Sequence, residues 1–326
     1  MSLSAYKRSS AGGKKKEKKD GNRVEEHKNF SEMADVVQAL LQKIDYTSDT
    51  TADPRTKDWF FLESSPLKVW ILTAMYILFV IYGPKYMKNR KPFDIRIFMV
   101  LYNLAMVVLS IYMFVEIILS TQALGYTVIC APYTKSNAQN PKEMRLARVL
   151  WWYYFSKAIE LMDTVLMILR KKNDQVTFLH VFHHATMLNI WWWVMMFIPG
   201  GQTWFGACLN CFIHVVMYTY YGLSAIPSLK KRLWWKKYIT KMQLIQFCVT
   251  FAHSANSIRV NCEFPSWGKY LLTCYMILMI ILFSNFYIQA YIKGRRNPNV
   301  DTANNYAKKK SSQNGSTING TVKKAQ

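Results

Sequence analysis

The sequence predicts an all-α integral membrane protein with seven transmembrane helices. Between Trp59 and Lys293, apolar runs of membrane-spanning length alternate with short connections that carry charge, Gly or Pro. The chain is 51% hydrophobic although two polar tails dilute its middle, so the middle itself is strongly apolar. Basic residues concentrate in the tails and in alternate connections, which is typical of a multi-pass membrane protein.

Seven apolar runs follow one another along this middle part. We expect spans at residues 69–82, 98–119, 149–169, 178–198, 204–223, 238–253 and 270–291. The first and sixth runs are short or polar, which leaves counts of six or eight helices open. The membrane domain then covers residues 59–293. The flanking tails, 1–58 and 294–326, combine high charge with low hydrophobicity and are expected to be disordered.

The distribution of charge predicts the orientation and argues against a nucleic-acid partner. The formal net charge is +23, but much of it lies in the tails and most of the remainder in three short connections, at 85–96, 170–172 and 230–237. The positive-inside rule places these connections and the C-terminus in the cytosol. An odd number of spans then places the N-terminus in the lumen, although the N-terminal tail is itself basic.

Short motifs in the tails indicate the endoplasmic reticulum. Lys323 and Lys324 stand fourth and third from the end of the predicted cytosolic tail, the spacing of a dilysine retrieval signal. Asn29 heads a glycosylation sequon on the predicted lumenal side, so we expect it to be modified. Asn314 and Asn319 also head sequons, but a cytosolic position predicts that they stay unmodified.

Two of the six cysteines are predicted to form a disulfide. Cys130 and Cys262 fall in the two longer lumenal connections, and the lumen is oxidising. The other four lie in predicted helices, where cysteine usually acts as a small apolar residue.

A histidine cluster is the feature of the sequence that most directly indicates chemistry. His180, His183 and His184 lie in one apolar run, and spacings of three and four residues place them on one helical face. Burying three titratable rings at membrane depth is costly, so such a cluster indicates a functional site. The alternative is three histidines packed against partners in a helix bundle.

Further polar stripes with helical spacing occur in three other predicted spans. Charges of both signs inside a membrane must pair or line a wet cavity, so the stripes suggest a ring of helices around a polar chamber. A purely structural Lys157–Glu160 pair is the alternative for the first stripe. The stripes are Lys157, Glu160, Asp163 and Thr164; Asn210, His214, Met217, Tyr218 and Tyr221; and Thr240, Gln243, Gln246 and His253.

These residues suit acyl transfer from an amphiphilic substrate. Basic residues at the cytosolic side would meet an anionic head group first, and apolar helices would accept a long tail, as in an acyl-CoA. A neutral imidazole is a competent nucleophile towards a thioester, and Asn or Tyr side chains can stabilise an oxyanion. Cys211, three residues before His214, ranks lower because no cationic cluster is evident to generate a thiolate.

Together these motifs resemble the eukaryotic ELO-type fatty acid elongases, the membrane 3-ketoacyl-CoA synthases of the endoplasmic reticulum. The four motifs occur in the family's order, with a basic segment at 168–173 between the first two. The resemblance covers residues 59–293 and is strongest to the animal elongases of very-long-chain and polyunsaturated acyl-CoAs. Cys211 departs from the family pattern, where Ser is usual, which weakens a role for it as an essential nucleophile.

The resemblance implies a decarboxylative condensation of acyl-CoA with malonyl-CoA to a 3-ketoacyl-CoA, CO2 and CoA, with no metal and no further cofactor. It also implies seven helices, six of them around a closed-ended acyl tunnel. Ketoacyl-CoA reductase, dehydratase and enoyl-CoA reductase are the implied partners, and a homo-oligomer stays open.

The resemblance also implies roles for individual residues. His183 would form an acyl-imidazole, with His214 as its partner and with His180 and His184 orienting the cluster. The other implied substrate contacts, which would polarise carbonyls, shape the chamber or bind the head group, are Asn210, Tyr218, Lys157, Glu160, Asp163, Tyr221, Gln243 and Gln246.

Two other functional classes share some of these features. Membrane di-iron desaturases and hydroxylases also contain an HxxHH motif, but they need several histidine clusters, and this chain has six histidines, one of them, His27, in a tail. A seven-helix receptor or transporter would share the topology, but it does not need charged stripes that converge near three histidines.

Overall fold

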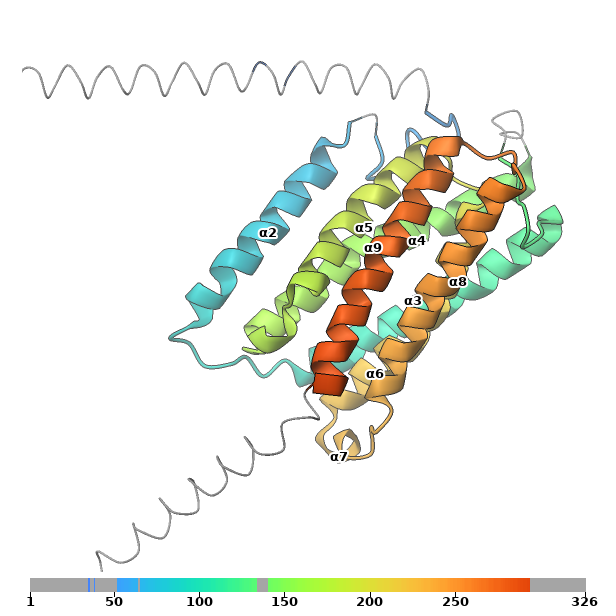
Figure 1. Ribbon diagram of the computed structural model, residues 1–326. Coiled ribbons are helices and arrows are strands. Elements are labelled where there is room, and N and C mark those ends of the chain that lie inside the picture. The colour runs from blue at the N-terminus through green and yellow to red at the C-terminus, as the bar shows by residue number, and fades with distance from the viewer. Residues whose placement is uncertain (1–34, 36–37, 39–51, 64, 134–139, 294–326) are drawn as a thin grey trace, which may run out of the picture.

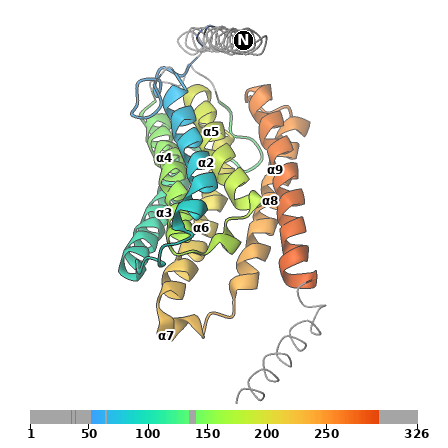
Figure 2. The same cartoon turned by 90° about the vertical axis from the view of Figure 1, so that its left-hand side faces the viewer.

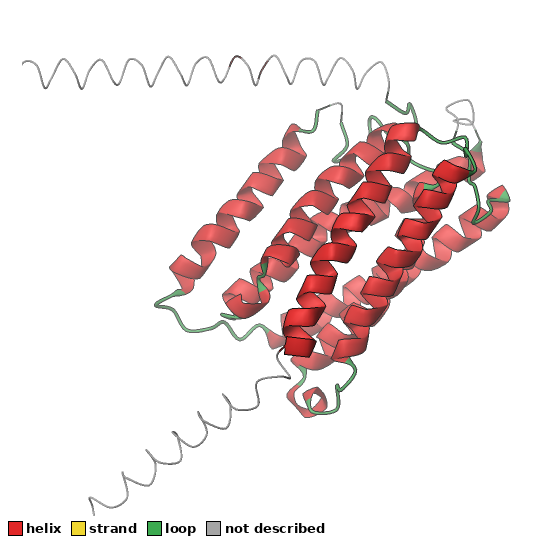
Figure 3. Ribbon diagram, in the orientation of Figure 1, coloured by secondary structure: helices red, strands yellow, loops and turns green. Residues whose placement is uncertain are grey.

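The computed structural model describes residues 35, 38, 52–63, 65–133 and 140–293, and no strand occurs among them (Figures 1 and 3). The predicted all-α class is therefore confirmed for this part of the chain. The long helices are α2 Leu67–Met87, α3 Arg96–Leu124, α4 Pro141–Leu169, α5 Phe178–Phe197, α6 Thr203–Ala225, α8 Lys236–Arg259 and α9 Ser266–Tyr287. Shorter elements are η2 Asn173–Gln175, α7 Pro227–Lys230 and the π-helical η3 Ile288–Lys293 after α9.

Each of the seven predicted spans coincides with one long helix, but several ends differ. The third helix begins at Pro141 rather than near residue 149, because Asn140 caps it by accepting a hydrogen bond from the Lys142 amide at 3.0 Å. The sixth runs on to Arg259 instead of ending near residue 253. Polar residues that looked like connections therefore belong to helices.

Six of the long helices form a closed ring. Around the ring, α4 packs on α5, α5 on α9, α9 on α8, α8 on α6, α6 on α3, and α3 on α4. The seventh helix, α2, packs on α4 and α5 and lies outside the ring (Figures 1 and 2). Six helices in a ring with a seventh outside it is the order that we expected, whereas the closed-ended acyl tunnel stays a prediction.

Three helices, α2, α3 and α9 with its η3 extension, are long and apolar enough to cross a membrane by length and composition. Their outer faces expose large apolar side chains such as Met75, Leu104 and Ile281. Exposed apolar bands of this kind suit a lipid environment. The remaining long helices carry the polar stripes, which lowers their apolar content.

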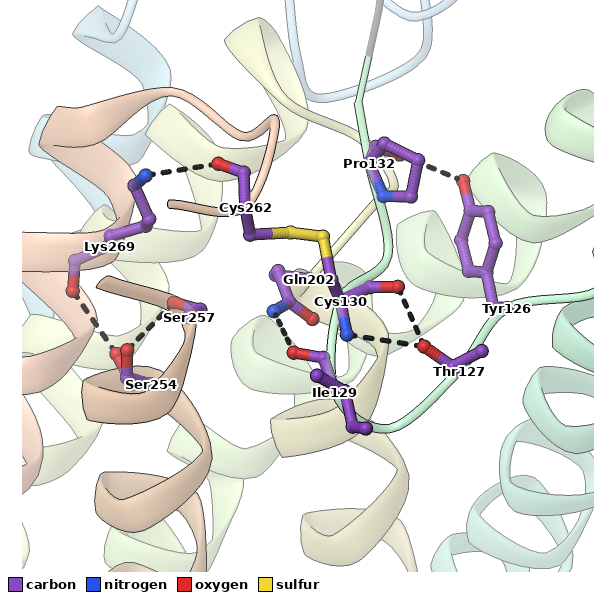
Figure 4. Close-up of a disulfide and its surroundings, with 10 residues drawn as sticks. All are labelled: Tyr126, Thr127, Ile129, Cys130, Pro132, Gln202, Ser254, Ser257, Cys262 and Lys269. Carbon is purple, nitrogen blue, oxygen red and sulfur yellow. Dashed lines mark hydrogen bonds between the residues drawn. A yellow bond between two sulfur atoms is a disulfide. The ribbon is translucent and has the colours of Figure 1, made fainter. Parts of the chain in front are cut away.

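The two ends of the bundle differ in chemistry. At the lower end in Figure 1, near α7, lie the three basic connections, and Lys171 Nζ donates to the Lys88 carbonyl at 2.9 Å across two of them. We call this the basic end. At the other end, Cys130 and Cys262 form a disulfide with a Cα–Cα distance of 5.5 Å (Figure 4). We call this the disulfide end.

A turn at the disulfide end requires glycine. Gly201, which lies just before α6, has a φ of +56°, and a Cβ there would meet Tyr133 Cβ at 2.7 Å. Only glycine combines this left-handed conformation with so close an approach. Glycine at position 201 thereby allows Tyr133 and Phe264 to pack closely against this turn.

The folded domain already includes residue 52, seven residues before the expected boundary. The boundary at residue 59 is therefore wrong, because Asp53 and Thr56 are fully buried. Thr56 Oγ1 donates to the Met195 carbonyl at 2.6 Å, and the Asp53 amide donates to the Met196 carbonyl at 2.8 Å. This segment packs on the end of α5 at the disulfide end.

Three aromatic side chains hold the continuation of this segment. The indole of Trp192 donates to the Leu62 carbonyl at 2.8 Å, and the hydroxyl of Tyr154 donates to the Phe61 carbonyl at 2.8 Å. The indole of Trp151 donates to the Phe60 carbonyl at 3.0 Å. Buried backbone carbonyls need such donors, so the segment 52–63 is built into the fold.

The predicted sites of modification and retrieval, Asn29, Asn314, Asn319, Lys323 and Lys324, lie outside the described residues and stay predictions.

Candidate functional site

The histidine cluster lies near the start of α5, at the half of the bundle closer to the basic end. Thr177 caps the helix by accepting a hydrogen bond from the His180 amide at 3.3 Å. The rings of His180 and His184 lie 4.4 Å apart between centroids, and those of His183 and His184 lie 5.6 Å apart. One turn of helix therefore groups the three imidazoles as the spacing predicts.

His180 and His183 are held differently. His180 Nε2 lies 2.8 Å from Thr164 Oγ1, and this hydroxyl also lies 3.0 Å from the Tyr76 hydroxyl. His183 Nδ1, in contrast, is buried and has no hydrogen-bond partner among the described residues. A ring nitrogen without a partner keeps its lone pair or proton available for chemistry.

The polar stripe of α4 forms a buried charge network with α6. Lys157 and Glu160 are 2% and 1% exposed, and Lys157 Nζ donates to Glu160 Oε1 at 2.7 Å. The same ammonium donates to Asn210 Oδ1 at 3.0 Å and lies 4.2 Å from the centre of the Tyr153 ring. A buried charge is stable only when paired in this way.

Glu160 also connects α4 to the lone histidine of α6. Nδ1 of His214 lies 3.4 Å from Glu160 Oε1, and Ser156 Oγ donates to that oxygen at 3.1 Å. A carboxylate beside Nδ1 favours the proton on that nitrogen and leaves Nε2 as the basic one.

Asp163 forms a second, separate pair. The Tyr218 hydroxyl donates to Asp163 Oδ2 at 2.8 Å, and both side chains are buried. Tyr218 therefore has no proton left for a substrate carbonyl, which differs from the role the sequence suggested. The pair joins α4 to α6 next to the histidines.

A cavity begins at this site, and residues of α4, α5, α6, α8 and α9 line it. Of the residues that the sequence analysis singles out, His183, Asn210, Gln246 and His253 line it. Asn210 Oδ1 accepts from Tyr153 and Lys157, and no hydrogen bond among the described residues uses its amide nitrogen. Asn210 can therefore donate to a carbonyl oxygen in the cavity.

The remaining predicted residues lie beside this cavity rather than on its wall. His180, His184, His214, Lys157, Glu160, Asp163 and Tyr218 pack behind it, and they are not among its lining residues. Gln243 Nε2 contacts Met217 Sδ at 3.7 Å, and Tyr221 stacks edge-on against Tyr218. Most of the lining is apolar, in contrast to the polar chamber that the stripes suggested.

Two site residues were missed by sequence reasoning. Tyr153 donates to Asn210 Oδ1 at 2.7 Å and lies one turn before Lys157 on the same face of α4. Tyr275 of α9 lines the cavity, and its hydroxyl lies 2.9 Å from Thr186 Oγ1. The spacing of Tyr153 from Lys157 was the available signal, but aromatic residues are too common in this chain for it to stand out.

Other reactive groups lie away from the cavity. Cys211 is buried as a free cysteine and is not among the lining residues. Within the described ranges, no group of three or more His, Cys, Asp or Glu side chains is arranged to hold a metal ion.

Comparison with known proteins gives a consistent result. The model of the ELO family, described as the GNS1/SUR4 family, matches residues 61–299, which include every helix from α2 to α9. The chain is 51% identical over 241 residues to very long chain fatty acid elongase 5 of Rattus norvegicus, covering 74% of this chain and 79% of the relative. It is 49% identical over 241 residues to elongase 2 of Mus musculus, covering 74% and 81%. It is 45% identical over 273 residues to elongase 4 of Homo sapiens, covering 83% of each. The chain therefore belongs to the GNS1/SUR4 (ELO) family.

Proposed function

We propose that this protein catalyses the condensing step of fatty acid elongation, as a very-long-chain 3-oxoacyl-CoA synthase. A long-chain acyl-CoA and malonyl-CoA would give a 3-ketoacyl-CoA two carbons longer, CO2 and free CoA. The observation that carries the proposal is His183, a half-buried imidazole at the wall of a long, mainly apolar cavity, whose buried Nδ1 has no partner among the described residues. Family membership favours this reading over the di-iron enzyme and the receptor or transporter.

The first half-reaction transfers the acyl group to the protein. A ring nitrogen of neutral His183 attacks the thioester carbonyl, the carbon–sulfur bond breaks, and CoA leaves as a thiolate that takes up the proton lost by the other ring nitrogen. The amide of Asn210 donates to the oxyanion that forms on the way. An acyl-imidazole with its tail in the cavity is the product.

The second half-reaction forms the new carbon–carbon bond. Malonyl-CoA loses CO2, and the electron pair of the broken bond becomes a carbanion at the carbon next to the thioester. This carbon attacks the acyl carbonyl, and His183 leaves with the electron pair of the carbon–nitrogen bond. Splitting the condensation in this way replaces one difficult step with two easier ones.

The buried network behind the cavity would support both steps. Glu160, held by Lys157, favours one tautomer of His214, whose Nε2 is then available as a base or proton donor. Fixing catalytic groups by neighbours of this kind is what keeps a site preorganised. His180 and His184 would orient the cluster from the same helix.

All seven long helices would cross the endoplasmic reticulum membrane, with the basic end in the cytosol. The basic connections at that end would attract the phosphates of both CoA thioesters. The disulfide end would face the oxidising lumen, as would the N-terminus. The reductases and the dehydratase of the elongation cycle would take up the product, and no cofactor beyond the two thioesters is needed.

An assay with labelled malonyl-CoA tests the function. Purified protein in nanodiscs receives an acyl-CoA and labelled malonyl-CoA, and label should appear in a 3-ketoacyl-CoA two carbons longer. The variant His183→Ala should make none, while Cys211→Ser should keep most of the activity. Full product formation by His183→Ala would contradict the proposed chemistry, and no product from the wild type would contradict the function.

A further inference from the structure

The cavity does not end in an apolar surface. From His183 it continues along α5 and α8 towards the disulfide end, where Thr203, Ser254 and five further polar side chains line it. All five are more than nine-tenths buried. We call this set the distal polar pocket: Gln202, Thr250, His253, Ser257 and Lys269.

Several polar atoms of the pocket have no partner. The hydroxyl of Thr250 and Oε1 of Gln202 make no hydrogen bond within the described residues. The ring of His253 stacks on Phe205, and its nitrogens, one of which faces the Val128 carbonyl, lie outside hydrogen-bonding geometry. On the way to the pocket, Gln246 Oε1 is also unpartnered.

Lys269 adds a charge to the pocket. It belongs to the first turns of α9, and Nζ donates to the Cys262 carbonyl at 3.0 Å, next to the disulfide (Figure 4). The Lys269 ammonium makes no other hydrogen bond and no ion pair among the described residues. An ammonium has three donors, so two are left for another group.

A methyl-terminated acyl chain would fit this pocket poorly. Each buried polar group that loses its partner destabilises the complex by about 1–3 kcal/mol, and a charged group by more. A chain of pure hydrocarbon would displace any water from these groups without replacing its hydrogen bonds. An oxygen atom at the far end of the chain would accept hydrogen bonds from the Lys269 ammonium and the Thr250 hydroxyl. If that oxygen belongs to a hydroxyl group, it could also donate to Gln202 Oε1.

We propose that the distal polar pocket binds an oxygen substituent at the ω end of the acyl chain, a hydroxyl or a carboxylate, so that the enzyme accepts ω-oxygenated acyl-CoAs. This inference rests on the proposed function, because it assumes that the thioester end lies at His183. The two substituents share the chemistry of an oxygen acceptor, and the carboxylate in addition neutralises the Lys269 charge.

Binding is measured first, independently of turnover. The His183→Ala protein receives three acyl-CoAs of equal chain length: unmodified, ω-hydroxy and ω-carboxy. We expect at least one ω-oxygenated thioester to bind about tenfold more tightly than the unmodified one, the gain from one buried hydrogen bond to a charged group. Thr250→Val and Lys269→Met, built on the same background, should remove this preference.

A matched lysine provides the control. Lys68 is an exposed lysine of α2 that pairs with Glu63. Its substitution Lys68→Met should leave all three affinities unchanged. In the wild-type protein, the preferred substrate should also show a lower KM with labelled malonyl-CoA.

The outcomes separate the two proposals. Elongation of the unmodified thioester together with equal binding of all three would overturn the distal pocket and leave the proposed function standing. Absence of any elongation would overturn the function. A loss of all three affinities in Lys269→Met, rather than of the preference alone, would show that Lys269 is structural and would also overturn the inference.

Discussion

The carboxylate oxygen Oε1 of Glu160 lies 3.4 Å from Nδ1 of His214, and the same oxygen accepts a hydrogen bond from Lys157. One buried oxygen thus connects a cation and an imidazole that come from different helices. Since the pair lies behind the cavity wall, its influence on the reaction runs through the position and tautomer of His214.

Replacing this carboxylate should slow acyl transfer. We expect Glu160→Gln to lower the rate of CoA release from acyl-CoA by about 10- to 100-fold, the usual effect of losing a group that orients a catalytic side chain. Stopped-flow detection of the free thiol measures the rate. Glu116→Gln is the matched control, because Glu116 pairs with Arg145 at the surface between α3 and α4. Equal rates for wild type and Glu160→Gln would contradict a role for this carboxylate.

Covalent catalysis predicts chemistry before malonyl-CoA is added. Wild-type enzyme given acyl-CoA alone should release CoA and retain an acid-labile acyl group on the peptide that contains His183. His183→Ala should abolish this release, and Cys211→Ser should leave it largely intact, because the buried Cys211 does not line the cavity. Mass spectrometry of rapidly digested protein locates the acyl group. No released CoA and no acylated peptide would favour general-base catalysis by His183 instead.

The helices and the histidine cluster were predictable because both follow from a repeat of one residue type along the chain. Apolar runs predicted the seven long helices, and the spacing of His180, His183 and His184 predicted that the three imidazoles share one helical face. Helix ends were less predictable. Residues 141–148 include four charged side chains and therefore looked like a connection, whereas the helix already begins after the Asn140 cap.

Features that depend on contacts between distant segments were missed for a different reason. Asp53 and Arg55 look like part of a charged tail, yet they pair with each other and are buried against Tyr133. The distal polar pocket likewise combines Gln202, just before α6, with residues of α8 and α9, and no single helix shows it. A charged residue in the sequence does not show whether the folded chain brings an oppositely charged or hydrogen-bonding side chain next to it.

The disulfide should contribute strongly to stability. Cys130 and Cys262 are 132 residues apart in sequence, and cross-linking so long a loop restricts the unfolded chain by about 4–5 kcal/mol. We therefore expect Cys130→Ser to lower the midpoint of thermal unfolding by several degrees, and mild reduction of the wild type to do the same. Cys248→Ser, at an exposed free cysteine, is the control. Identical midpoints for Cys130→Ser and the control would show that the bond is dispensable.

The buried pair at the disulfide end predicts a dependence on pH. Burial alone would raise the pKa of Asp53, but hydrogen bonds from Arg55 and Tyr133 outweigh it and hold that pKa below the ordinary value of 3.8. A carboxyl with a lowered folded-state pKa contributes its full stability above the unfolded value and loses it as the pH falls through the folded value.

Asp53→Asn should therefore destabilise the protein at neutral pH by about 3 kcal/mol, because it leaves Arg55 buried with Glu143 at 3.7 Å as its remaining charged neighbour. The difference from the wild type should persist down to about pH 4 and shrink only below it. Unfolding midpoints measured across this range test the prediction. A difference that already disappears between pH 7 and pH 5 would contradict the lowered pKa.

Product length should depend on the width of the cavity along α6. Ala207 is fully buried and lines the cavity between the histidines and the disulfide end. If the acyl tail passes there, Ala207→Leu should shorten the longest product while shorter acyl-CoAs are still elongated. Chromatography of the products, with unfolding midpoints of the same proteins, measures both effects. Ala105→Leu, at an exposed position on the outer face of α3, is the matched control. If the space were instead filled by protein, the added methyl groups would cost about 1–3 kcal/mol of stability and leave the product profile unchanged. That combination would reject a tunnel as the determinant of chain length.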